Sequence, residues 1–353
     1  MECFGSMETV KVGESHPFIT VIVTAHKRTR FLITCLQSVI NQSLDRSKYE
    51  IILVKNSKDE LINEFAGNNN IRVLDTDLES LGKKIVLAME ESGGEVLCFL
   101  EDDDVFEPGK LEYVYTRFAS DVTLCYFHNS LKDVLDASGN KITRKENSLS
   151  FRFYITTSWE PDNVMGIYRF SPDWNNSCIS VRKSVIAPHA KIISELNVGQ
   201  IDSMLYYLSL ISDYNLLIEA VPLTSYRMNA DSATKNIGDF RSYRALFYKD
   251  FLCANRSFNY VMDIKNPPRS QLIGSFLLNV IRINLFMLNE QANAAISFWQ
   301  IMSFMRLSLK FGLRFHFSLS IIALAQRLHN GLGPKLFFFA RQVNFNFRTR
   351  ESH

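Results

Sequence analysis

The sequence lacks the hallmarks of several protein classes. Its six cysteines stand singly, with no CxxC pair and no histidines at the spacing of metal ligands. Isolated cysteines in apolar runs are typical of small core residues in a reducing compartment, which argues against a zinc site or a disulfide framework. Residues 1–16 contain no continuous apolar run. We therefore interpret them as a flexible N-terminal segment without a signal peptide and expect the folded part on the cytoplasmic side.

Acidic residues are missing from the last part of the chain. Residues 291–350 contain eight lysines and arginines but no aspartate or glutamate. The whole chain of 353 residues has a net charge of +2, so the rest of it is net acidic. A content of 46% hydrophobic and 22% charged residues argues against disorder and indicates two or three folded domains. The opposite charges of the two parts indicate different tasks.

Short apolar runs alternate with amphipathic stretches from residue 18 onward. Such alternation is typical of a parallel sheet covered by helices on both faces, so we predict an α/β fold with a Rossmann-like, mostly parallel sheet. Ligands of such sheets bind beyond the carboxyl ends of the strands. The predicted strands are 18–24, 49–54, 71–74, 95–100, 150–156, 178–181 and 216–220, and the predicted helices are 31–41, 59–65, 81–91, 202–210 and 239–260.

One predicted strand runs directly into a cluster of carboxylates. Residues 97–108 read LCFLEDDDVFEP, so four acidic residues, 101–104, follow four apolar ones. Adjacent carboxylates repel one another and are costly to desolvate, so they need a compensating partner. Mg²⁺ or Mn²⁺ would supply one, because these ions prefer hard oxygen ligands and substrate phosphates. The alternative is a solvated acidic turn in which Asp104 caps a following helix.

Three ordered stretches carry a family resemblance over residues 18–234. ITVIVTAHKRTRFLITCLQSVINQSL, YEIILVKNSKDE and SGGEVLCFLEDDDVFEPGKLE resemble the family 2 glycosyltransferases, which are inverting enzymes of the GT-A fold. The resemblance implies a GT-A-type domain in which residues 17–130 bind the nucleotide-sugar and residues 131–265 bind the acceptor. It also implies Mg²⁺ or Mn²⁺ as cofactor, with metal ligands and a donor-binding residue in the acidic cluster. The metal ligands are Glu101 and Asp103, and the donor-binding residue is Asp102.

The same resemblance implies further residues around the donor. Lys55 stands where the family has an Asp that accepts a hydrogen bond from the uracil N–H, and because Lys has no acceptor the identity of the base stays open. The alternative for Lys55 is a solvated surface lysine. A turn after the first strand would contact the nucleotide, and two basic residues would lie near its phosphates. The alternative for the first basic residue is an exposed position on a helix, and the alternative for the second is a salt bridge at the sheet edge. The turn residues are Thr24, Ala25 and His26, and the two basic residues are Lys83 and Arg227.

An inverting transfer needs a general base that deprotonates the acceptor hydroxyl. In the resembled family this base is an Asp at the start of a helix, often preceded by Glu. Asp202, with Ile201 before it, matches that position. We therefore predict Asp202 as the catalytic base. The alternative is that Asp202 is the N-cap of the helix, a position that favours Asp.

The basic part of the chain is also rich in apolar residues. Polar and basic residues interrupt its apolar runs, so none meets the ~20 apolar residues of a spanning helix. Arg306, Lys310 and Arg314 are spaced to form one basic stripe on a helix. We predict that residues 266–353 form a helical, amphipathic extension that lies on the membrane surface. The alternatives are a helical subdomain packed on the catalytic core and a dimer interface. The apolar runs are 272–288, 301–317 and 319–328.

Together these interpretations predict a metal-dependent, inverting glycosyltransferase bound peripherally to the cytoplasmic face of the cell membrane. It would move a sugar from a nucleotide-sugar donor to a lipid-linked or other glycan acceptor at that membrane, and no nucleic-acid partner is expected. Two other functions stay open. One is a non-catalytic nucleotide-sugar or membrane-surface binding protein, suggested by the altered Lys55 and Glu101. The other is a sugar nucleotidyltransferase, which would lack a single-displacement base. The oligomeric state is not predicted.

Overall fold

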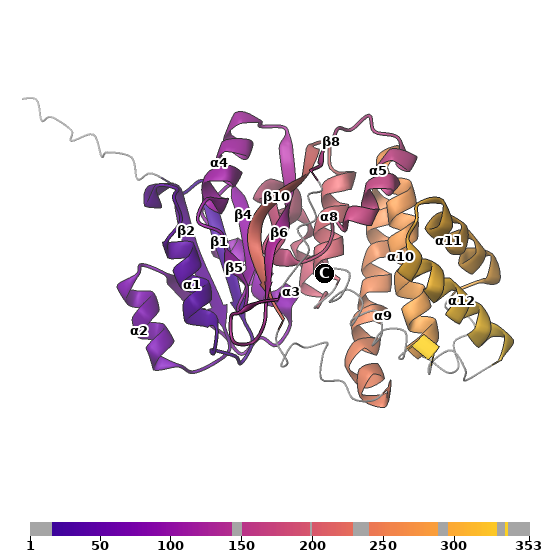
Figure 1. Cartoon of the computed structure of the whole chain (residues 1–353), viewed down its shortest axis with the longest axis horizontal. Helices are drawn as coiled ribbons and strands as arrows, with labels where there is room; N and C mark the ends of the chain where they lie inside the picture. Colours follow the sequence, from indigo (N-terminus) through magenta and orange to yellow (C-terminus); the bar gives the residue numbers. More distant parts are fainter. Residues whose placement is uncertain are drawn as a thin grey trace, which may run out of the picture.

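A computed structural model of the chain describes residues 16–142, 150–197, 200–228, 240–288, 296–329 and 336–337. The predicted flexible segment, residues 1–16, lies outside these residues except for its last position. Figure 1 shows a sheet-containing part on the left, formed by the first two thirds of the chain, and a group of long helices on the right.

The first part of the sheet is parallel, as predicted. Its elements are β1 (Ile19–Ala25), α1 (Leu32–Ile40), η1 (Arg46–Lys48), β2 (Tyr49–Lys55), α2 (Glu60–Asn68), β3 (Arg72–Asp75), α3 (Leu81–Glu91) and β4 (Val96–Glu101). The strands hydrogen-bond in the order β3-β2-β1-β4, all in the same direction. Each strand lies within two residues of its predicted bounds, because short β-branched runs between polar loops are a strong local signal.

The second part of the sheet is mixed rather than parallel. Its elements are β5 (Val105–Phe106), α4 (Lys110–Ser120), β6 (Leu124–Leu135), β7 (Lys141–Ile142), β8 (Arg152–Ile155), α5 (Pro161–Ile167), η2 (Tyr168–Phe170), η3 (Asn176–Cys178), β9 (Ile179–Arg182), α6 (Lys183–Ile186), η4 (Ala187–His189), α7 (Ala190–Ser194), α8 (Ile201–Ile211) and β10 (Asn215–Arg227). β9 runs antiparallel to both β4 and β6, whereas β10 runs parallel to β6. The predicted α/β class with a mostly parallel sheet is confirmed, because β6 and β10 run in the direction of the first four strands and the antiparallel β9 lies between β4 and β6. The sequence analysis missed β6 because the strand buries polar His128 and Asn129 in its middle, which hides its apolar pattern.

Each face of the sheet has its own hydrophobic core. In β1, Val21 and Val23 belong to one core, whereas Ile22 between them belongs to the other. This alternation is the two-residue period of a strand. The core with Val21 and Val23 is completed by α1, α2 and α4. The other core is larger, and it continues through α3, α5 and α8 into the C-terminal helices.

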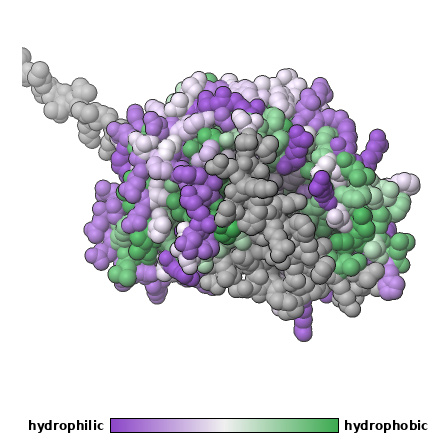
Figure 2. Space-filling view, viewed as in Figure 1, coloured by the Kyte–Doolittle hydropathy of each residue, from purple (hydrophilic) through white to green (hydrophobic). Residues whose placement is uncertain are grey.

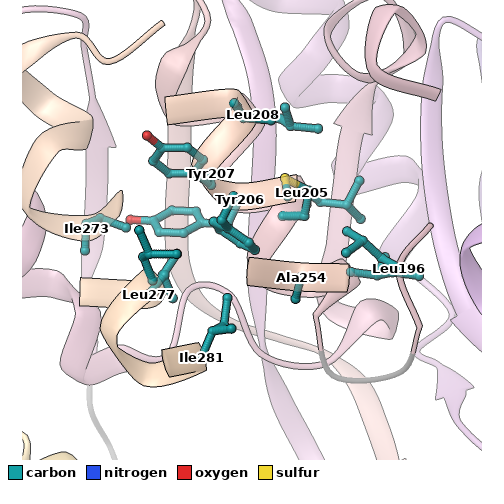
Figure 3. Packing of buried hydrophobic residues seen from close by; sticks show 14 of the residues in the cluster. Leu196, Leu205, Tyr206, Tyr207, Leu208, Ala254, Ile273, Leu277 and Ile281 are labelled. Carbon is teal, nitrogen blue, oxygen red and sulfur yellow. The ribbon is translucent and has the colours of Figure 1, made fainter. Parts of the chain in front are cut away.

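The C-terminal helices pack on the sheet-containing part. They are α9 (Phe240–Ile264), α10 (Pro268–Leu288), α11 (Phe298–Lys310) and α12 (Arg314–Leu328). Figure 3 shows Tyr206 and Tyr207 of α8 against Ile273 and Leu277 of α10. At the start of α10, the fully buried Arg269 donates to the Leu210 carbonyl at the end of α8, at 2.7 Å. The hydrophobic core therefore continues across the boundary predicted at residue 266. α10 packs on the sheet-containing part, which was one of the alternatives for the C-terminal extension.

α10 has the length and composition of a membrane-spanning helix, which corrects the expectation that no stretch would meet this criterion. It has 21 residues, and its most apolar window has a mean hydropathy of 1.6. However, 72% of that window is buried inside the protein. Among the described residues, the apolar composition of α10 is explained by its position in the protein core.

Arg306, Lys310 and Arg314 do not lie on one helix as predicted, because the chain breaks between α11 and α12. Gly312 has a φ of 69°, a left-handed conformation that glycine adopts without strain. The N–H of Leu313 donates to the Ser308 carbonyl at 2.8 Å, which closes the end of α11. The basic stripe is interrupted here, since Lys310 ends α11 and pairs with Asp162 of α5.

Candidate functional site

The carboxyl ends of the parallel strands meet at one edge of the sheet. Thr24 of β1 pairs with Glu101 of β4, and Ala25 pairs with Lys55 of β2. Lys55 in turn pairs with Asp75 of β3. The polar clusters that follow these strands therefore lie together, as the sequence predicted, and we call this edge the strand-end site.

An arginine is the partner of the acidic cluster. Arg28, in the loop after β1, donates to Asp102 Oδ1 at 2.5 Å and to Asp103 Oδ2 at 3.1 Å. Both carboxylates are buried, and the backbone N–H of His26 donates to Asp102 Oδ2 at 3.3 Å. The chain adopts a left-handed conformation at Lys27, with φ 57°. Sequence reasoning assigned Arg28 no role, although a basic pair directly after the first strand was a usable signal.

Asp104 is a buried structural carboxylate and does not cap a helix. It accepts the backbone N–H of Arg227 at 2.9 Å and the side-chain amide of Asn175 at 3.2 Å. The Arg227 side chain donates to the Asp103 carbonyl at 3.0 Å and lies 4.4 Å from the centre of the Phe31 ring. Arg227 therefore holds the acidic turn in place, and its predicted contact with a phosphate stays a prediction.

The acidic cluster has too little positive charge for its carboxylates. Burial, helped by Asp104, raises the pKa of Glu101 well above its usual range. Burial also raises the pKa of Asp102 to about 6, although Arg28 acts in the opposite direction. Burial and the neighbouring Asp103 raise the pKa of Asp104 to about 7. A further cation at this position would therefore be stabilised.

The donor chemistry of the cluster fits a divalent cation that is shared with a substrate. Carboxylate oxygens are the ligands that Mg²⁺ and Mn²⁺ prefer, and Mg²⁺ is commonly held by one or two carboxylates plus substrate phosphates. Among the residues that the structure describes, no three His, Cys, Asp or Glu side chains form a ready-made metal cage. Glu101 and Asp103 thus fit a cation bound together with a diphosphate.

Of two adjacent lysines on α3, Lys84 faces the strand-end site and the predicted Lys83 is exposed. Lys84 donates to the Ala25 carbonyl at 2.7 Å, and burial lowers its pKa to about 8. Adjacent helical residues point about 100° apart, so only one of the two can face the sheet. The His26 ring is half-exposed and lies 3.3 Å from Glu79; burial and Lys84 lower its pKa.

Lys55 is buried, which excludes a solvated surface lysine. Its Nζ donates to the Ser57 carbonyl at 2.9 Å and to Asp75 Oδ1 at 2.5 Å. Lys55 therefore uses its charge within the protein.

Asp202 lies in the first turn of α8 and is not its N-cap. α8 begins at Ile201, and the N-cap Gln200 makes no side-chain cap hydrogen bond. Burial and the nearby Asp173 raise the pKa of Asp202 to about 7. Asp202 is also close enough to the acidic cluster to contribute to the raised pKa of Glu101. A carboxylate that takes up a proton near neutral pH beside the predicted metal ligands has the properties of a general base.

The loop that leads into β9 joins the acidic cluster to Asp202, a role that the sequence pattern does not indicate. The backbone N–H of Asn175 donates to Asp202, and its side-chain amide donates to Asp104. The Ser177 hydroxyl accepts the N–H of Glu101 at 3.1 Å. Asn175 has a φ of 67°, a left-handed conformation that Asn tolerates better than most residues and that is frequent at functional sites.

The fold and the site define a class of protein. The sequence profile of glycosyl transferase family 2 matches residues 20–172. S. aureus TarS, as its fragment 1–349, superposes with a TM-score of 0.54 at 13% identity, covering 90% of each chain. The mannosyltransferase PcManGT from Pyrobaculum calidifontis superposes with a TM-score of 0.51 at 13% identity, covering 90% of this chain and 88% of that one. The fold is therefore that of the GT-A glycosyltransferases.

Curated relatives agree with this class. EpsH of Bacillus subtilis, named as a glycosyltransferase, is 24% identical over 180 residues, which are 49% of each protein. The glycosyltransferase AglE of Haloferax volcanii is 30% identical over 94 residues, 25% of this chain and 31% of AglE. The chain spans half or less of the length of these relatives. Residues 20–172 thus match a family 2 glycosyltransferase domain, in agreement with the predicted family.

Proposed function

We propose that the protein is a metal-dependent, inverting glycosyltransferase that moves a sugar from a nucleotide-sugar donor to a lipid-linked or other membrane-associated glycan. One observation carries this proposal: Asn175 donates to both Asp104 and Asp202, so the acidic end of β4 and the carboxylate of Asp202 lie close together. The similar structures support a nucleotide donor, because TarS is solved with UDP and with UDP-GlcNAc, and PcManGT with GDP-Man and Mn²⁺.

The residues divide the chemistry between them. Glu101 and Asp103 would hold Mg²⁺ or Mn²⁺, which supplies positive charge to the leaving diphosphate. Asp202 takes the proton of the acceptor hydroxyl as that oxygen attacks the anomeric carbon, and the bond to the diphosphate breaks on the opposite face. A pKa of about 7 suits this task, since the base must be deprotonated before the transfer and protonated after it.

The proposed location is the cytoplasmic face of the membrane. Binding to a membrane surface, and with it a membrane-associated acceptor, is supported by the surface of the C-terminal helices. Trp299, Leu309 and Ile321 are 78%, 59% and 50% exposed on α11 and α12. Figure 2 shows hydrophobic residues gathered over these helices at the right edge of the molecule. Arg306 and Arg314 are exposed on the same two helices. Exposed apolar side chains beside basic ones are typical of surfaces that bind anionic lipid.

The test is sugar release and transfer from nucleotide-sugars with Mn²⁺, measured on the wild type and on Asp103→Asn. We expect the wild type to show metal-dependent turnover. Asp103→Asn should abolish both this turnover and the metal-dependent binding of nucleotide, while the melting curve of the variant stays cooperative. Binding without turnover would favour the non-catalytic binding protein. Formation of a sugar nucleotide from a sugar phosphate and a nucleoside triphosphate would favour the nucleotidyltransferase.

A further inference from the structure

Lys55 and Asp75 form an ion pair of unequal exposure at the ends of β2 and β3. The Lys55 side chain is 1% exposed, whereas that of Asp75 is 61% exposed. Lys55 is held on its other side by the Ser57 carbonyl. A buried ammonium needs such partners, because an unpaired buried charge is costly. The pair therefore fixes one Asp75 oxygen and leaves the rest of that carboxylate facing outward in a defined place.

The neighbouring polar groups at this corner are already engaged with one another. Asn56 accepts the N–H of Lys27 at 3.0 Å through its side-chain oxygen. Glu79 pairs with Lys27 at 2.9 Å and with His26 at 3.3 Å. The Ser57 hydroxyl, in contrast, is buried without a hydrogen-bond partner among the described residues. The corner thus offers a ligand one fixed and exposed carboxylate acceptor, that of Asp75.

The position of this corner matches the length of a nucleotide. The strand order β3-β2-β1-β4 places the end of β3 three strands away from the acidic end of β4. Neighbouring strands lie about 4.8 Å apart, so the separation is roughly 14 Å. This is comparable to the length of an extended nucleoside diphosphate. A donor whose diphosphate lies at Glu101 and Asp103 can therefore reach Asp75 with its base.

We propose that Asp75, held in place by Lys55, selects the base of the donor by accepting a ring N–H, from N3 of uracil or N1 of guanine. Cytosine and adenine carry a lone pair at the corresponding ring nitrogen, which a carboxylate repels. This inference rests on the proposed function, because it takes the strand-end site to hold a nucleotide-sugar. Asp75 would also supply the acceptor that Lys55 cannot provide at the place where the resembled family has an Asp.

The experiment is calorimetric titration of the full chain with UDP, GDP, CDP and ADP in the presence of Mn²⁺. We expect UDP or GDP to bind at least about tenfold more tightly than CDP and ADP, since a hydrogen bond to a charged group contributes at least this much. The comparison of UDP with GDP then identifies the base. Asp75→Asn should reduce the ratio of these affinities by about tenfold. The main cause should be tighter binding of CDP relative to UDP, because the amide of Asn can donate to the ring nitrogen of cytosine. Asp77→Asn is the matched control, an exposed carboxylate on the same loop whose loss should change nothing.

The possible outcomes separate the inference from the function on which it rests. If no nucleoside diphosphate binds with Mn²⁺, the proposed function fails and the inference with it. If nucleotides bind but all four bind equally, or if Asp75→Asn keeps the wild-type preference, only the inference is overturned. Equal weakening of all four by Asp75→Asn would assign the carboxylate to the ribose, which also overturns it. A melting curve of Asp75→Asn checks the fold, because the amide oxygen can still accept from Lys55 but no longer balances its buried charge.

Discussion

Asp202 titrates in the pH range where its charge decides whether it can act as a base. Burial and Asp173 raise its pKa to about 7, and Glu101 is the nearby carboxylate of the acidic cluster. A base works only when deprotonated, so kcat should rise as the pH increases through about 7 and level off above it. Asp202→Asn should lower kcat by roughly 10²–10⁴-fold, leave donor affinity near the wild type, and remove this rise. The measurement is a pH–rate profile at saturating donor.

Asp173→Asn provides a control for this assignment. The substitution removes a negative charge that raises the pKa of Asp202 but keeps an oxygen that can accept the Ser203 hydroxyl. The rise in kcat should therefore move to lower pH without disappearing. If the profile of Asp202→Asn keeps its rise, the base is another group.

Arg28 neutralises part of the acidic cluster in the absence of a metal ion. Arg28→Met should lower the free energy of unfolding by about 1–3 kcal/mol, less than for a fully buried pair because 32% of the Arg28 side chain is exposed. Arg28 lowers the pKa of Asp102, which stands at about 6, so the stabilisation is present above this pH and is lost as Asp102 becomes protonated. The loss should therefore be larger at pH 8 than at pH 5 in urea denaturation. Arg30→Met, at an exposed position, is the control; an equal effect there would count against the pairing.

At the scale of helices and strands, the sequence predicts what local patterns encode. The four parallel strands and the acidic end of β4 were predictable, because β-branched runs and polar loops alternate in the chain. The choice between Lys83 and Lys84 was not, since the rotation of α3 depends on how it packs. The contacts of Asn175 with Asp104 and Asp202 join distant segments through single hydrogen bonds, for which no local pattern exists. The break at Gly312 lay within an apolar run that reads as one helix.

The contact between α8 and α10 depends on a glycine. A Cβ at Gly274 would lie 2.8 Å from the Tyr207 hydroxyl oxygen and 2.9 Å from its ring, closer than side chains approach. Because Tyr207 is fully buried, Gly274→Val should separate the two helices and lower the free energy of unfolding by about 1–3 kcal/mol. Since α8 carries Asp202, activity should fall as well. Chemical denaturation and turnover measure the two effects.

A second helical glycine gives the matched control for this packing. At Gly166 of α5, a Cβ would meet nothing within 4 Å. Gly166→Val should therefore be close to neutral. Equal destabilisation by both substitutions would mean that the effect comes from the helix backbone and not from the contact with Tyr207.

At the scale of the whole molecule, the net acidic part and the basic part share one core. α10 covers Tyr206 and Tyr207, and its Arg269 bonds the carbonyl of Leu210 at the end of α8. Removal of the chain beyond residue 267 would expose this core, so a truncated protein is expected to unfold. Truncation therefore cannot test the membrane proposal, and surface substitutions on α11 and α12 are needed instead.

The exposed surface of α11 and α12 should bind anionic vesicles through two separable contributions, burial of apolar side chains and attraction of basic residues to the lipid charge. Burial of apolar side chains in the membrane resists salt, so Trp299→Ser with Leu309→Ser should weaken pelleting at both low and high salt. Each basic residue near the surface contributes about 1 kcal/mol that salt screens. Arg306→Glu with Arg314→Glu should therefore weaken pelleting at low salt alone.

The matched control for these variants lies on the opposite part of the molecule. Leu61 and Val122 are 71% and 75% exposed on the sheet-containing part, so Leu61→Ser with Val122→Ser removes similar apolar surface away from the proposed membrane face. This control should pellet like the wild type, and all variants should keep transfer to a short soluble acceptor, because their substitutions lie outside the strand-end site. If the wild type stays in the supernatant with anionic vesicles at low salt, the C-terminal helices serve the fold alone, and the acceptor must reach Asp202 from solution.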